Sequence, residues 1–161
     1  MFGGQEKQAR INLSGTWTGE YQYAPPAVGV PAAFILNLRQ GWLGRITGTV
    51  QDGPEGMPEE GKVTGWLRGN RLTFRKQMPV FRVASEGRTV PLAEYLAASG
   101  ELRISANMPH PSILYEGTAG GDGQSLSGVW NVSESVIRLA GQARALQFPG
   151  YKGSWVARRR E

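Results

Sequence analysis

The chain has 161 residues, of which 40% are hydrophobic and 19% charged, a balance that fits one globular domain with its own core and argues against wholesale disorder. It has no cysteine and one histidine, which excludes disulfides, thiol chemistry and the usual zinc sites, and no apolar run approaches the roughly 20 residues that span a bilayer. The net charge of +5 is spread over most of the predicted strands, so we do not expect nucleic acid as a partner.

Hydrophobic and polar residues alternate with a period of two through the first half of the chain, which is the pattern of half-buried strands. The predicted strands are 11–23, 33–39, 45–51, 62–68 and 71–77. They are separated by a proline-containing loop at 24–31, a turn at 41–44, an exposed loop at 52–61 and the hairpin dipeptide Gly69-Asn70. Connections this short favour antiparallel neighbours.

Residues 78–109 interrupt the alternation and are predicted to form an insertion that serves as a lid for one mouth of the fold. They contain a short apolar run at 80–83, a helix at 91–98 that begins with a proline and stops at Ser99-Gly100, and a strand-like piece at 102–106. Strands return at 112–118, 125–132 and 151–159. The segment 134–149 is compatible with a pair of strands or with one helix.

These elements predict an all-β fold: an eight-stranded antiparallel up-and-down β-barrel with one short helix in an insertion. Residues 1–10 are expected to be a flexible N-terminus and 11–161 the single barrel domain, with an open sandwich as the alternative. A tetrad Ser/Thr-Gly-x-(Trp/Val/Leu) recurs at 14–17, 47–50, 64–67 and 127–130, with a looser copy at 152–155. Its glycines indicate points where strands bend or approach one another closely.

The first tetrad carries a family resemblance. Gly15-Thr16-Trp17 on the first strand resembles the Gly-x-Trp signature of the calycin superfamily, which contains the lipocalins, the fatty-acid-binding proteins and the avidins. The order LSGTW, an apolar strand, ITGTV and VTGWL is similar to the first half of avidin and streptavidin. The resemblance implies a barrel that forms oligomers, and an arginine of the last strand, Arg158 or Arg159, that packs across Trp17.

Biotin binding does not follow from this resemblance. Avidins place an asparagine two residues after the tryptophan to hold the ligand, and this chain has Gly19 there. Glycine cannot replace an amide that satisfies a buried carbonyl group. We therefore expect a lipocalin-like or avidin-like barrel that does not bind biotin.

Strand parity predicts which side chains would line a cavity inside the barrel. The inward face collects aromatic side chains and one lysine: Tyr21, Tyr23, Phe34, Lys76, Tyr115 and Trp130. An apolar cup with tyrosines and one cation would suit a small amphipathic anion, such as a carboxylate with an apolar body. The alternative is an interior filled by these same side chains.

No segment has the pattern of a catalytic or metal site. His110, in Pro109-His110-Pro111, is expected to be a solvated loop residue, and Glu116 to face outward from its strand. We therefore predict no catalytic residue, no metal and no cofactor. The expected function is non-catalytic binding or assembly in the cytoplasm.

Two alternatives to ligand binding stay open. The first is an oligomerising module with a filled barrel, whose outer face would carry Trp66, Val129 and Trp155. The second is a calycin-type isomerase or lyase that uses Lys76, Tyr21 or Glu116 for proton transfer.

Overall fold

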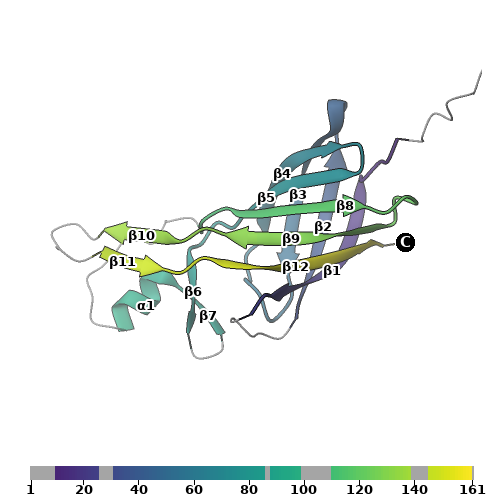
Figure 1. Ribbon diagram of the computed structural model, residues 1–161. Helices are drawn as coiled ribbons and strands as arrows, with labels where there is room; N and C mark the ends of the chain where they lie inside the picture. The colour runs from purple at the N-terminus through teal and green to yellow at the C-terminus, as the bar shows by residue number, and fades with distance from the viewer. Residues whose placement is uncertain (1–9, 26–30, 86–87, 99–109, 139–144, 161) are drawn as a thin grey trace, which may run out of the picture.

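Eight long strands form a closed antiparallel barrel, as the alternation predicts (Figure 1). The computed structural model describes residues 10–25, 31–85, 88–98, 110–138 and 145–160. The barrel strands are β1 (Gly15–Tyr23), β2 (Ala32–Gln40), β3 (Arg45–Asp52), β4 (Gly61–Arg68), β5 (Arg71–Gln77), β8 (Ile113–Ala119), β9 (Ser125–Val132) and β12 (Tyr151–Arg159). Consecutive members of this set pair with one another, and β12 pairs with β1. This closure rules out the open sandwich.

Two hairpins and one helix lie at one end of the barrel, away from the C-terminus (Figure 1). They are the pair β6 (Arg82–Ser85) and β7 (Arg88–Pro91), the helix α1 (Leu92–Ala98), and the pair β10 (Ser135–Arg138) and β11 (Ala145–Phe148). The predicted helix is confirmed, and the ambiguous segment 134–149 contains a strand pair. The strand-like piece predicted at 102–106 and residues 1–9 lie outside the described residues.

The two accessory hairpins share a small core of their own. Phe81, Leu92, Leu96 and Ile137 are buried together, and Phe148 packs against them. The segment that contains Phe81, Leu92 and Leu96 therefore packs against the hairpin that contains Ile137 and Phe148, a contact that the sequence did not predict. Together these two segments form an accessory unit beside one mouth of the barrel.

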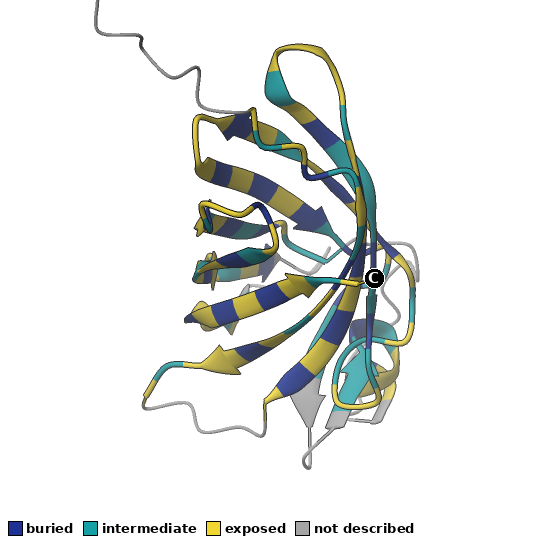
Figure 2. Cartoon of the chain, turned by 90° about the vertical axis from the view of Figure 1, so that its right-hand side faces the viewer, coloured by how far each residue is buried: buried dark blue, intermediate teal, exposed yellow. Residues whose placement is uncertain are grey.

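Buried and exposed residues alternate along every barrel strand (Figure 2). The inward residues form one continuous core that includes Trp17, Phe34, Phe74 and Trp130. Trp155, which was predicted to face outward, is only 2% exposed and belongs to this core. Lys152, Ser154 and Arg158 share the opposite face of its strand, so the alternation along this strand was the available signal for an inward Trp155. In the ladder Trp155 lies opposite Tyr21.

Glycines of the tetrads allow backbones to approach one another beneath a tryptophan. Gly128 lies directly opposite Gly117 in the ladder between β9 and β8, and a Cβ on Gly128 would collide with the carbonyl oxygen of Glu116. The ring of Trp155 covers Gly117 at a distance that leaves no room for a side chain there. The predicted geometric role of this tetrad is confirmed.

The first strand is shorter than predicted. It begins at Gly15, whose φ of 137° favours glycine, and the residues before it leave the ladder. Leu13 donates its backbone N–H to the side chain of Gln40, and Trp17 donates its indole N–H to the Leu13 carbonyl. Because Leu13 is fully buried, this segment closes the end of the barrel opposite the accessory unit.

Candidate functional site

Arg159 closes the barrel over the signature tryptophan. Its guanidinium lies 4.6 Å from the centroid of the Trp17 ring and donates to the carbonyl oxygens of Ser14, Asn12 and Gly123. The sequence left Arg158 and Arg159 as alternatives for this role. The structure selects Arg159, because Arg158 falls on the outward parity of β12 and is exposed.

A buried ion pair lies in the opposite half of the barrel. The Nζ atom of Lys76, on β5, lies 2.6 Å from an oxygen of Asp52 at the end of β3, and the two side chains are 2% and 1% exposed. The second oxygen of Asp52 accepts the backbone N–H of Met57 at 3.1 Å. Burial lowers the pKa of Lys76, and the charge and hydrogen bond of Asp52 oppose that shift. The positive charge of Lys76 is therefore balanced by the carboxylate of Asp52 inside the protein.

Asp52 is the residue that the sequence analysis missed, because it was assigned to an exposed loop. It continues the inward parity of Ile46 and Val50, so β3 extends one residue further than predicted and Asp52 is buried. This alternation along β3 was the sequence feature that could have identified Asp52 as a buried residue.

Four of the six predicted cavity residues form one aromatic cluster. Tyr21 stacks on Phe34 at 6.3 Å between centroids and contacts Trp130 edge-on at 5.8 Å. Tyr23 contacts Trp130 at 5.0 Å and Tyr151 at 5.7 Å. The cluster therefore runs from the barrel interior to its mouth.

The other two predicted residues have different partners. Tyr115 stacks on Phe74 at 4.7 Å and contacts Trp155 edge-on at 5.6 Å. Lys76 binds Asp52 and also lies 5.3 Å from the centroid of the Tyr21 ring. Burial raises the pKa values of Tyr21 and Tyr115, so both phenols stay protonated at neutral pH.

The interior side chains of the barrel are closely packed. Five of the six predicted residues are between 2% and 9% exposed, with Tyr23 the exception at 38%. An open cup would expose its lining side chains to water. These burial values favour a packed core over an open cup.

A pocket of about 280 Å³ lies instead between the barrel mouth and the accessory unit. Its walls come from β6, α1, the loop before β8, and the segments that join β9 to β10 and β11 to β12. Aromatic and aliphatic groups form most of the lining, with several polar side chains between them: Phe81, Arg82, Val83, Tyr95, His110, Pro111, Val132, Ser133, Ser135, Gln147, Phe148, Pro149 and Tyr151. We call this the mouth pocket. Through Tyr151 it touches the aromatic cluster of the barrel.

His110 is the most informative polar residue of the mouth pocket. It is half-buried rather than solvated, with its ring 5.4 Å from that of Phe81. Burial, with a smaller effect from the charge of Lys76, lowers the pKa of His110 to about 4. Its Nδ1 accepts the backbone N–H of Arg82 at 3.4 Å, so the neutral ring carries its proton on Nε2. No described residue accepts a hydrogen bond from that Nε2–H.

Arg82 lines the same pocket, but its guanidinium is already bonded. It forms an ion pair with Glu59, with a shortest distance of 2.6 Å, and Nη1 donates to the carbonyl oxygen of Thr89. That pairing lowers the pKa of Glu59. Arg82 therefore ties the loop before β4 to the accessory unit and does not offer a free positive charge.

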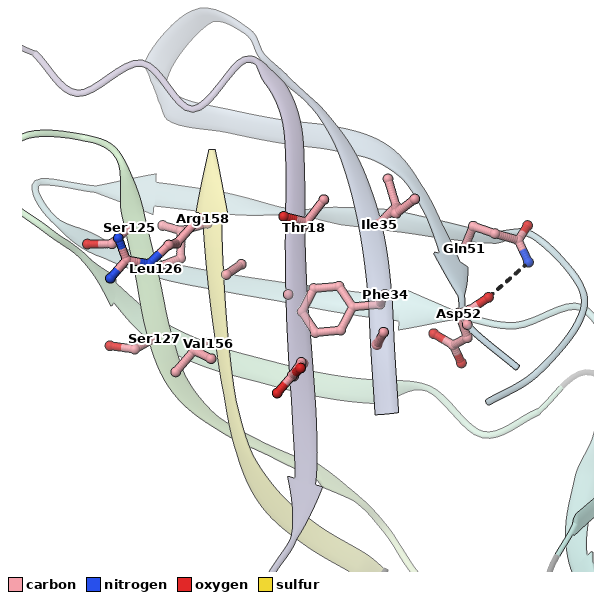
Figure 3. A pocket seen from close by; sticks show the side chains of 15 residues that line it. Thr18, Phe34, Ile35, Gln51, Asp52, Ser125, Leu126, Ser127, Val156 and Arg158 are labelled. Atoms are coloured by element: carbon pink, nitrogen blue, oxygen red, sulfur yellow. Dashed lines mark hydrogen bonds between the residues drawn. The ribbon is translucent and has the colours of Figure 1, made fainter. Parts of the chain in front are cut away.

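A larger and more open groove of about 590 Å³ lies on the outer surface of the barrel, over β9, β12, β1, β2 and the end of β3 (Figure 3). We call this the outer groove. Outward side chains line it, among them Thr18, Ile35, Ser127, Val156 and Arg158. Ile35 is 37% exposed and Val156 56% exposed. As predicted, Glu116 faces outward, on β8 and away from this groove.

Within the described parts of the chain, no three His, Asp or Glu side chains are grouped so that they could hold a metal ion. No helix among the described residues is long and apolar enough to cross a membrane. Comparisons of the chain with protein-family models, with curated proteins and with solved structures find no match.

Proposed function

We propose that this protein binds a small, uncharged ligand with an aromatic body in the mouth pocket. The observation that carries the proposal is the contrast between a barrel core packed with side chains and a ring-lined pocket at its mouth. Mostly apolar walls with a few placed polar groups are the usual composition of a small-molecule site. The volume of 280 Å³ falls just below the roughly 300–1,000 Å³ of drug-sized sites, so a ligand of one or two rings fits best.

The charged groups near the mouth pocket favour a neutral ligand over an anionic one. Lys76 is bound to Asp52, Arg82 is bound to Glu59, and His110 is neutral at pH 7. A carboxylate in the mouth pocket would lose its hydration without gaining a free cation, which is costly. A carbonyl or ring nitrogen that accepts the Nε2–H of His110 would satisfy that donor instead.

The fold assignment within the calycins is part of the same proposal. Gly15-Thr16-Trp17 on the first barrel strand and Arg159 across Trp17 support it. The space beside Gly19, where an avidin carries its ligand-holding asparagine, is taken by the backbone carbonyl of Val156 and the ring of Phe34. A side chain at position 19 would displace that ring, which supports a function other than biotin binding.

The test is a ligand-detected NMR screen of neutral aromatic fragments and their anionic counterparts, such as benzamide and benzoate. We expect neutral fragments to bind the wild-type protein better than the anions. Ser133→Trp, which fills the mouth pocket from its wall, should abolish their binding. Ser154→Trp on the outer face of β12 is the matched control and should leave binding unchanged. Hits that survive Ser133→Trp would contradict the proposal.

A second function, self-association through the outer groove, is favoured by the placement of charge there. Glu20 and Arg158 lie diagonally on adjacent strands, within a strip that also contains Val156, which is the residue opposite Glu20. No described residue forms an ion pair with either charge. A two-fold axis through this strip would bring each Arg158 to the partner's Glu20. Sedimentation should then show a dimer that Arg158→Glu dissociates and that Arg158→Glu with Glu20→Arg restores. A monomer at high concentration would rule this function out.

A further inference from the structure

The turn between β2 and β3 exposes two large apolar side chains at its tip. Trp42 is 88% exposed and Leu43 is 74% exposed, and no residue of this short 3-10 turn, η1 (Trp42–Gly44), is buried. Figure 1 shows the turn reaching beyond the neighbouring strand ends, away from the accessory unit. We call these two residues the apolar tip. Exposure of this degree at two adjacent positions is unusual on a protein surface in water.

The apolar tip is held in a defined conformation. Gly41 donates its backbone N–H to the carbonyl oxygen of Arg45 at 2.7 Å, which closes the turn. Gly44 lies so close to the backbone of Leu67 on β4 that a Cβ would collide with it. Leu43 itself has φ 57° and ψ 25°, a left-handed conformation that a leucine adopts only at a cost in free energy. The sequence therefore keeps a bulky apolar residue where glycine would be easier.

Basic side chains extend from the apolar tip along the barrel wall. Six cations project outward from strands β2 to β5: Arg39, Arg45, Lys62, Arg68, Arg71 and Arg75. These four strands present no exposed acidic side chain among the described residues. Arg39 and Arg45 flank the tip on its own hairpin, and Arg68 and Arg71 flank the adjacent turn at the same end of the barrel. We call this set the basic face.

An exposed tryptophan joins the basic face to the apolar tip. Trp66 is 42% exposed on β4, opposite Arg45 in the ladder, and the guanidinium of Arg45 lies 5.3 Å from its ring centroid. An indole ring with a cation over it is suited to the boundary between hydrocarbon and polar groups. Trp66 therefore lies beside Arg45, among the arginines at the end of the barrel that carries the apolar tip.

We propose that the apolar tip inserts into the interface of an anionic lipid bilayer while the basic face binds the lipid headgroups. Shallow burial of Trp and aliphatic side chains combined with attraction of arginines to acidic lipids is how peripheral proteins bind membranes. Single-stranded nucleic acid would also attract the cations. It would gain nothing from Leu43, however, because bases stack on aromatic rings and not on aliphatic side chains.

The experiment is flotation of the full chain with vesicles of phosphatidylcholine alone or with one quarter phosphatidylglycerol. We expect binding only to the anionic vesicles, weakened about fivefold for each of Arg39, Arg45, Arg68 and Arg71 that is replaced by glutamine. Trp42→Ser with Leu43→Gly should reduce binding at least about tenfold. Because glycine relieves the left-handed backbone, this double variant should keep or raise its melting temperature, so a loss of binding cannot be a loss of folding.

Val136→Ser is the control, since Val136 is 55% exposed on β10 in the accessory unit. It should bind anionic vesicles as the wild type does. Equal binding of wild type and the tip variant, or equal binding to neutral and anionic vesicles, would overturn the proposal. So would binding to a single-stranded oligonucleotide at lower concentrations than to vesicles.

Discussion

Removal of one partner of the buried ion pair should destabilise the fold strongly. Lys76→Met keeps the length of the side chain but leaves Asp52 charged at a site where its side chain is 1% exposed. Breaking a buried pair in this way costs about 3–5 kcal/mol. Asp52 retains the Met57 N–H as a donor, so we expect the lower half of this range, about 3 kcal/mol. At roughly 2–4 °C per kcal/mol, the melting temperature should fall by about 6–12 °C.

Urea unfolding at pH 7 measures this loss, and Lys62→Met on the exposed face of β4 is the matched control. The control should stay within about 0.5 kcal/mol of wild type. Asp52→Asn combined with Lys76→Met removes both charges and should recover at least half of the loss. A Lys76→Met variant as stable as the control would refute the argument that Lys76 serves to neutralise Asp52.

Three further outcomes follow from the geometry. The free energy of unfolding should fall by up to about 3 kcal/mol as the pH drops from about 6.5 to about 4. The cause is the lowered pKa of His110 in the folded protein, so that the unfolded chain takes up a proton first. In urea unfolding at each pH, His110→Gln should show a weaker pH dependence than wild type. Arg159→Met should cost about 2–4 kcal/mol through three lost carbonyl hydrogen bonds and the contact with Trp17, whereas Arg158→Met should be neutral in the same assay. Gly128→Ala should lower stability by about 1–3 kcal/mol because of its collision with a backbone carbonyl, and Gly121→Ala, in open space, should not.

Local alternation was enough to predict the barrel. Each of its eight strands buries one face, so a period of two marks them, and short turns such as Gly69-Asn70 fix their antiparallel order. For β12 the predicted orientation of Trp155 was wrong, although Lys152, Ser154 and Arg158 mark the opposite face of the strand as the outward one. Alternation could not say that the hairpin of β10 and β11 shares a core with α1 and Phe81, since that contact joins parts of the chain far apart in sequence.

The candidate site was less predictable than the fold. Strand alternation correctly placed Phe34, Lys76 and Tyr115 inside the barrel. How tightly the interior packs depends on how the side-chain volumes fit together, which alternation does not predict. The walls of the mouth pocket come from several segments that meet only when the accessory unit packs beside the barrel. No single stretch of sequence therefore predicts the pocket. His110 looks like a loop residue between two prolines, and only the ring of Phe81 and the backbone of Arg82 give it a neutral, oriented imidazole.

In the proposed function the ligand lies in the mouth pocket and not inside the barrel. Intermolecular nuclear Overhauser effects from a bound neutral aromatic fragment would locate it. We expect contacts from the fragment to the rings of Phe81, His110 and Phe148, which line the pocket. Contacts instead to Tyr115 or Trp155, which meet edge-on in the barrel core, would contradict it.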